Sequence, residues 1–219
     1  MKKYFFALIT TCLGSYAFAQ LAVRNEPRHH NVFENDYVRV LDVWIAPKDT
    51  TQFHLHATPS VFTTLTKTIT SALSGQQAAR STSVAGSSWY DSLVTPRFHR
   101  VWNDDTTWFH VMDIELVAGK PHINEPVLQN AAMKSLFDEP LVRGYHIELA
   151  KSENFKLPSS KAGYLLVSLG EASVTIQSNG TNQHRLMKAG HYCWIDAGQV
   201  VSISSNNSAL ATFTLLQLK

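Results

Sequence analysis

Two histidines one residue apart carry the clearest chemical signal in this chain. They are His54 and His56, in a stretch of residues 52–56 that otherwise has the character of a β-strand. Successive side chains of a strand point to opposite faces, so residues i and i+2 share one face. Neutral imidazole is a common ligand of zinc, iron, copper and nickel. The pair therefore predicts the beginning of a metal site.

The elements that would position these histidines are predicted to be strands. Residues 37–45 and 61–65 are rich in β-branched and aromatic residues, and residues 97–102 and 106–116 flank a turn at residues 103–105 as a hairpin would. Residues 20–31 are polar and are interpreted as an N-terminal arm. Because adjacent residues of a strand face opposite ways, the pair His29-His30 cannot chelate as His54 and His56 do, and surface positions are expected for it.

The sequence also contains an internal repeat. Residues 37–46 align with residues 141–150 at an offset of 104, and residues 107–116 align with residues 209–218 at an offset of 102. This repeat predicts two similar all-β units, at residues 32–120 and 141–219, built as sandwiches or barrels. Pairing of the two units would cover some exposed strand edges. Residues 121–140 are expected to connect them, with a mildly helical patch at residues 127–137.

The N-terminus and the composition limit the function classes. Residues 1–19 have the lysines, the apolar stretch and the Ala17-Phe18-Ala19 end of a secretory signal peptide, too short to span a membrane, which predicts a periplasmic or secreted protein. Without Lys2 and Lys3 the chain has 17 basic and 17 acidic residues. It contains no basic run, which argues against nucleic acid as a partner. Cys193 would be the one cysteine left, so no internal disulfide is expected.

The chain resembles the cupin superfamily. His54-Leu55-His56 is similar to its first motif, and His99 followed by Asn103 is similar to its second. In the second unit, residues 188–191 and 195–198 resemble the family's two glycine turns. The resemblance covers most of residues 32–219. It implies an all-β fold of two tandem double-stranded β-helix (jelly-roll) barrels.

The resemblance also implies a ligand set. The three histidines of the motifs, His54, His56 and His99, would hold one divalent transition metal such as Fe, Mn, Ni or Zn. Ser60 stands where the family has a glutamate ligand, and His110 on the next strand is an open candidate for a fourth ligand. Asn103 and Gln52 are candidates for orienting the rings.

The second unit is expected to be degenerate. The ungapped repeat places Pro158 and Ser160 at the positions of His54 and His56, and Val201 at the position of His99. All three candidate ligands are absent together, which supports the view that they act together in the first unit.

Two classes of function remain open from the sequence. One is an exported metal-dependent oxygenase, isomerase or lyase of a small organic molecule, with Tyr90 and Asp91 as acid or base candidates by proximity in sequence. The alternative is a non-catalytic module that binds a small ligand or a partner protein, because this fold hosts many functions. Neutral ligands leave the charge of the metal uncompensated, which favours an anionic ligand. A homodimer is compatible with either class.

Overall fold

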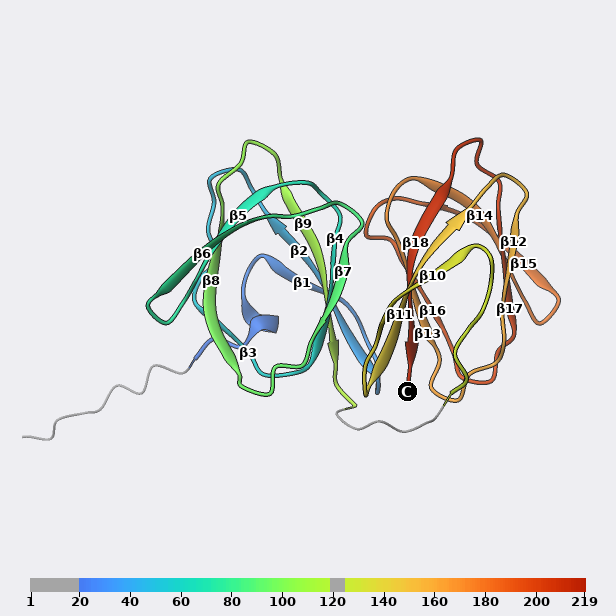
Figure 1. The fold of residues 1–219 in the computed structure, drawn as a ribbon, viewed down its shortest axis with the longest axis horizontal. Coiled ribbons are helices and arrows are strands. Elements are labelled where there is room, and N and C mark those ends of the chain that lie inside the picture. The colour runs from blue at the N-terminus through green and yellow to red at the C-terminus, as the bar shows by residue number, and fades with distance from the viewer. Residues whose placement is uncertain (1–19, 119–124) are drawn as a thin grey trace, which may run out of the picture.

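The computed structural model describes residues 20–118 and 125–219, and strands dominate them (Figure 1). The first unit holds a short 3-10 helix, η1 (Val23–Asn25), and nine strands: β1 (His29–Glu34), β2 (Val38–Ile45), β3 (His54–His56), β4 (Ser60–Thr64), β5 (Ile69–Ser74), β6 (Gln77–Thr82), β7 (Ser88–Asp91), β8 (Arg97–Asn103) and β9 (Phe109–Leu116). The second unit holds nine more: β10 (Met133–Asp138), β11 (Val142–Leu149), β12 (Asn154–Leu157), β13 (Tyr164–Ser168), β14 (Ala172–Ser178), β15 (Thr181–Met187), β16 (Tyr192–Ile195), β17 (Val201–Ser205) and β18 (Ala211–Leu218).

Each unit is a barrel made of two antiparallel sheets. In the N-terminal barrel the five-stranded sheet has the order β1-β2-β9-β4-β7 and the four-stranded sheet has the order β3-β8-β5-β6. The C-terminal barrel repeats this order strand for strand, as β10-β11-β18-β13-β16 and β12-β17-β14-β15. Even the irregular register recurs, between Asn31 and Phe33 in β1 and between Ser135 and Phe137 in β10. The expected all-β fold of two tandem barrels is thus what the structure shows.

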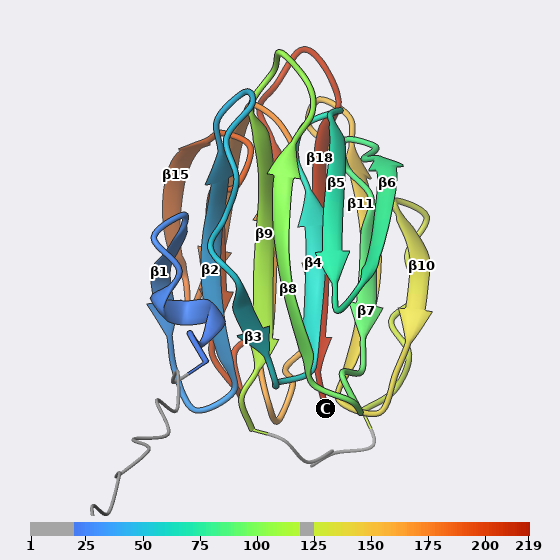
Figure 2. The same ribbon diagram turned by 90° about the vertical axis from the view of Figure 1, so that its left-hand side faces the viewer.

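The two barrels pack through the outer faces of their five-stranded sheets, which lie side by side in Figure 1 and one behind the other in Figure 2. Along β2, Val38 and Val40 contribute to the apolar cluster between the barrels, whereas Val43 and Ile45 face the interior of their own barrel. Both faces of the sheet are therefore covered, which explains why β4 and β9 are buried along nearly their whole length. The barrels meet mainly by sheet faces, and their edge strands also come into contact: the Tyr192 hydroxyl of β16 donates to the Val32 carbonyl of β1 at 2.6 Å.

Two expectations about the connections are wrong. The patch at residues 127–137 is not helical, because residues 133–138 form β10, which pairs with β11 and completes the second five-stranded sheet. The connector is correspondingly shorter than residues 121–140. Residues 20–31 are no free arm either, because η1 and β1 lie against the N-terminal barrel, where the Leu55 N–H donates to the Leu21 carbonyl at 2.8 Å. Tertiary pairing outweighs the weak local propensity of such segments.

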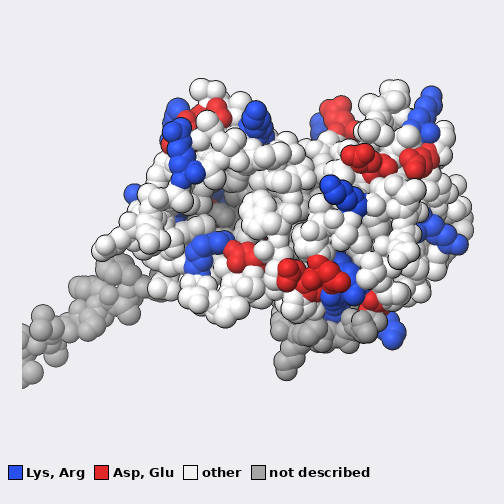
Figure 3. Space-filling model, in the orientation of Figure 1, with Lys and Arg blue, Asp and Glu red and all other residues white. Residues whose placement is uncertain are grey.

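The signal-peptide prediction falls on residues 1–19, which lie outside the described residues. Within the described parts of the chain, no helix has the length and apolarity needed to cross a membrane. On the face shown in Figure 3, basic and acidic side chains are interspersed, and the N-terminal barrel is hollowed.

Candidate metal centre

The structure brings His54, His56 and His99 together inside the N-terminal barrel. His54 and His56 lie on one face of β3, and His99 on β8 pairs directly with His54 across the two strands. The His99 ring centroid lies 4.8 Å from that of His54 and 4.9 Å from that of His56, and the two Nε2 atoms of His54 and His56 are 3.0 Å apart. All three rings are buried. Their spacing follows from the two-residue period of the strand and the register of the strand pair.

A fourth histidine, His29, belongs to the same cluster. It begins β1, and its ring centroid lies 4.8 Å from His54 and 6.2 Å from His56. One ligand atom from each of His29, His54 and His56 can be chosen so that all lie within 4.8 Å of one another. The expectation that His29 is a surface residue is wrong, because β1 docks with His29 inward, opposite Val43, and leaves His30 outward. Alternation along the strand separates the two histidines as expected, but only tertiary packing makes one face an interior.

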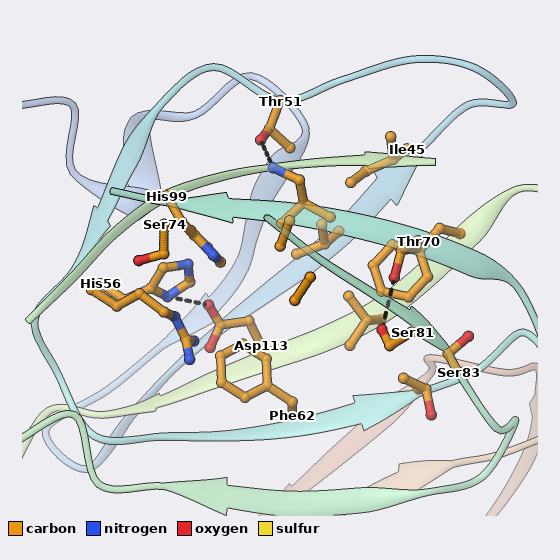
Figure 4. A pocket seen from close by; sticks show the side chains of 18 of the residues that line it. Ile45, Thr51, His56, Phe62, Thr70, Ser74, Ser81, Ser83, His99 and Asp113 are labelled. Carbon is orange, nitrogen blue, oxygen red and sulfur yellow. Dashed lines mark hydrogen bonds and ion pairs between the residues drawn. The ribbon is translucent and has the colours of Figure 1, made fainter. Parts of the chain in front are cut away.

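Oxygen atoms face the Nδ1 atoms of three of the rings, two of them at hydrogen-bond distance. The Nδ1 of His54 lies 2.8 Å from the main-chain carbonyl of Gln52, and the Nδ1 of His29 lies 2.8 Å from Glu26 Oε2. His56 Nδ1 faces Asp113 Oδ2 at 3.5 Å (Figure 4). A proton held on Nδ1 leaves the lone pair on Nε2, so these contacts favour Nε2 as the ligand atom of each ring. Gln52 acts here through its backbone, not through the side chain that the sequence suggested.

Asn103 lies apart from the rings and orders the β8–β9 turn. Its amide donates to the carbonyls of Ile45 at 3.1 Å and Thr107 at 2.7 Å, and its Oδ1 accepts from the Asp105 N–H at 2.9 Å. These bonds hold the end of the strand that carries His99. Asn103 therefore supports the strand rather than the imidazoles.

Burial keeps His54, His56 and His99 neutral. Desolvation lowers the pKa of His54 to about 4 and that of His99 to about 3, with the neighbouring charged and imidazole groups adding to the effect at His99. The pKa of His56 is lowered further, first by burial and then by repulsion from His99 and His54. At neutral pH these three imidazoles each have a free lone pair, which is the state that binds a metal.

The buried carboxyl of Asp113 shows the opposite response. Burial, followed by repulsion from Glu115, raises its pKa to about 8. Both Asp113 oxygens, His56 Nδ1 and His99 Nε2 are buried without a hydrogen-bond partner. Unsatisfied buried polar atoms are costly and uncommon, and a cation among the Nε2 atoms of the rings would give His99 Nε2 a partner. The donor set, neutral nitrogens backed by carboxylates, suits a divalent transition metal.

Asp113, like His29, is a residue of the site that the sequence motifs did not indicate. Ser60 on β4, where a glutamate was expected, is buried and its hydroxyl donates to the Thr58 carbonyl at 3.1 Å. Asp113 comes from the neighbouring strand β9, where it pairs with Phe62, and so reaches the cavity from a different part of the sequence. The signal available in the sequence was an aspartate flanked by apolar residues in Val111-Met112-Asp113-Ile114, although Glu115 and His110 in the same strand weaken it.

His110 does not complete the site. Its Nε2 lies 2.7 Å from Asp42 Oδ1, and its ring stacks on Trp44 with the centroids 3.6 Å apart. Along β9 the interior side chains are Val111 and Asp113, so His110 points to the outer face of the sheet. Sequence could not fix this face, because the turn before β9 sets the phase of the strand.

A cavity of about 570 Å³ adjoins the histidines inside the N-terminal barrel. Figure 4 shows His56, His99 and Asp113 at one end of it and the hydroxyls of Thr70, Ser81 and Ser83 toward the other. Its apolar lining includes Phe62, stacked on Trp89 with the centroids 5.3 Å apart. Tyr90, the acid or base candidate from the sequence, packs in the cluster between the barrels and does not line this cavity.

Two of the three equivalent positions in the C-terminal barrel are apolar. Val201 pairs with Ser178 as His99 pairs with Ser74, so Val201 takes the place of His99. Val201 also pairs with Leu157, which therefore takes the place of His54, one residue before the Pro158 that the ungapped repeat assigned. Leu157 and Val201 lie in the apolar core of that barrel.

Comparison with known proteins yields structural likeness only. No protein-family model matches the sequence, and no curated protein matches it. A cupin 2 conserved barrel domain protein from Leptotrichia buccalis is 9% identical, with 87% of this chain and 88% of that chain covered and a TM-score of 0.55.

Two further solved structures share the fold. Salicylate 1,2-dioxygenase from Pseudoaminobacter salicylatoxidans, in adducts with gentisate, is 9% identical, with 90% and 72% covered and a TM-score of 0.61. YhaK from Escherichia coli is 15% identical, with 86% and 90% covered and a TM-score of 0.56. With its two tandem barrels and these neighbours, the chain has the fold of the cupin superfamily.

Proposed function

We propose that this chain is an exported metal-dependent oxygenase of a small anionic organic molecule, with one divalent transition metal held by His54, His56 and His99. The observation that carries the proposal is the convergence of neutral, buried imidazoles at the end of a cavity, with the Asp113 carboxyl facing His56 Nδ1. Iron(II) in such a site would supply coordination positions and electrons for activating dioxygen. The chain's own residues do the binding, orienting and shielding.

An anionic ligand is supported by Arg97. It pairs with His56 across β3 and β8, lines the cavity, and lies with its guanidinium carbon 5.8 Å from the Phe62 ring centroid. Its Nη1 donates to Asp91 at 2.6 Å, while its Nε is buried without a partner. A carboxylate or phenolate entering the cavity would satisfy that donor and offset the charge of the metal. The cavity volume is in the range of small-molecule sites.

The ionisable groups of the lining favour an oxygenase over an isomerase or a lyase. Besides the histidines they are Arg97 and Asp113, and Asp113 faces the Nδ1 of His56 rather than standing free as a base. Asp91 is committed to Arg97. Proton abstraction needs a free base within reach of the substrate, whereas addition of dioxygen depends on the metal and on exclusion of water.

The second candidate is a non-catalytic module that holds a small ligand on the metal. The same absence of a free base in the lining favours it, because such a module needs only the cavity, Arg97 and the histidines. The C-terminal barrel, whose interior is filled by apolar side chains, would serve in both cases as a structural partner of the first.

Metal content and oxygen consumption test the proposal. Purified protein loaded anaerobically with iron(II) is expected to hold one metal per chain, and replacing both His54 and His56 by alanine is expected to abolish it. Addition of small aromatic and aliphatic carboxylates to the loaded protein should consume dioxygen for at least one of them. Arg97→Gln should keep the metal and lose affinity for the anion.

The outcomes separate the two candidates. Metal retained by the double alanine variant removes the site. Binding of a carboxylate without oxygen consumption over the whole panel removes the oxygenase and leaves the binding module. Export is tested separately, by finding Gln20 as the first residue of the mature protein.

A further inference from the structure

We propose that His29 is a fourth metal ligand, which the segment of residues 20–31 carries into the N-terminal barrel in place of the carboxylate ligand missing at Ser60. The inference rests on the proposed metal site. It adds that the metal ties the N-terminal segment to the barrel.

The first support is geometric. His29 offers a ligand atom within 4.8 Å of ligand atoms of His54 and His56. Its Nδ1 is engaged by Glu26 Oε2 at 2.8 Å, so Nε2 is the nitrogen left for a metal. This is the arrangement of a ligating histidine backed by a carboxylate. His30, the next residue, is exposed and points away.

The second support is the way in which the segment holds this ring. Glu26 is almost fully buried, and besides His29 it accepts from the Arg28 N–H at 2.7 Å and the Gln52 N–H at 3.1 Å. Arg28 in turn makes a two-bond contact with Asp49, at 2.7 and 2.8 Å. The carboxylate thus bridges the segment to the residue that also orients His54. These hydrogen bonds hold the His29 ring in one orientation, which apolar packing alone would not do.

The third support is the internal comparison between the two barrels. Met133 begins β10 as His29 begins β1, and it pairs with Ile147 as His29 pairs with Val43. Met133 packs against the apolar core, alongside Leu157 and Val201 at the places of His54 and His99. The fold therefore accepts an apolar residue at this position. A histidine stands there in the barrel that has the other histidines, and an apolar residue stands there in the barrel that lacks them.

A purely structural histidine would not follow this pattern. Within the described residues, the His29 ring makes one hydrogen bond, from its Nδ1 to Glu26, and the ring lines the cavity beside the other histidines. A metal bound at Nε2 supplies the second partner. It also restores the four donors that the motif would have had with a glutamate at position 60.

Cobalt(II) binding to the full mature chain tests the inference. The variants are His29→Met, which copies the residue of the second barrel and so should fold, and His30→Ala as the matched neighbour. Methionine sulfur is a soft ligand that suits Cu(I) rather than Co(II). We expect His29→Met to lower the Co(II) affinity by on the order of 100-fold and to change the visible absorption bands, since even outer-shell losses give 10–100-fold. His30→Ala should leave both unchanged.

A second readout follows the N-terminal segment. In wild-type protein, Co(II) should slow proteolysis and hydrogen exchange within residues 21–31, and in His29→Met this protection by the metal should disappear. Unchanged affinity, spectrum and protection in His29→Met would overturn the inference. His54→Ala distinguishes failure of the whole metal site from failure of the role of His29. If this variant keeps full Co(II) affinity, the proposed site itself is wrong. If it loses the metal while His29→Met does not, only the role of His29 fails.

Discussion

The variant Asp113→Asn is expected to change the stability of the metal-free chain and the metal affinity in opposite directions. The side chain is 1% exposed, both oxygens are unpartnered, and burial raises its pKa from 3.8 to about 8. Because the folded chain holds this proton more tightly than the unfolded chain, stability falls as the pH rises from about 4 to about 8. Asparagine has nearly the same shape and does not titrate, so it removes this penalty.

The magnitude follows from linkage. Between pH 3.8 and pH 7 the full effect would be about 4 kcal/mol, at about 1.4 kcal/mol per pH unit. Asparagine still leaves buried polar atoms without partners, at a cost of about 1–3 kcal/mol. We therefore expect the metal-free variant to be more stable than wild type by about 1–3 kcal/mol at pH 7.5, and less stable than wild type near pH 4, where only the asparagine cost of about 1–3 kcal/mol remains.

Metal binding should change in the opposite direction. Asp113 is the acceptor that faces His56 Nδ1, and loss of such an outer partner weakens metal binding by about 10–100-fold. Urea unfolding in the presence of a chelator, from pH 4 to pH 8, measures the first effect, and competition with a chromophoric chelator measures the second. The exposed Asp36→Asn controls for the loss of one charge. A variant that is no more stable at pH 7.5, or whose advantage does not grow with pH, refutes the reasoning.

The remaining predictions concern packing. His110→Ala loses the stack on Trp44 and the bond to Asp42, so urea unfolding should show a loss of about 1–3 kcal/mol, with one metal per chain still bound; metal loss would return His110 to the site. Gly144→Ala should destabilise the chain by about 1–3 kcal/mol, because its Cβ would overlap three atoms of the Phe137 ring. A neutral outcome in thermal unfolding would mean that β10 does not pack against β11 as described.

Local sequence determined the strands and the histidine pair. The two-residue period places His54 and His56 on one face wherever that strand lies, and the apolar alternation of residues 37–45 fixes the two faces of β2. The repeat at an offset of 104 reflects real equivalence, since the same strand order and the same irregular register recur in both barrels. The resemblance of His99 to a second motif led to the residue that pairs directly with His54.

Only the tertiary structure decided which other residues join the cluster. His29 and Asp113 lie 25 residues before and 59 residues after His54, and no local pattern relates such distances. His29 faces inward because β1 pairs with β2, and His110 faces outward because the turn before β9 sets its phase. Periodicity fixes which side chains share a face, but sheet pairing and packing decide which face becomes an interior. The histidine pair could therefore be predicted from the sequence, whereas His29 and Asp113 beside it could not.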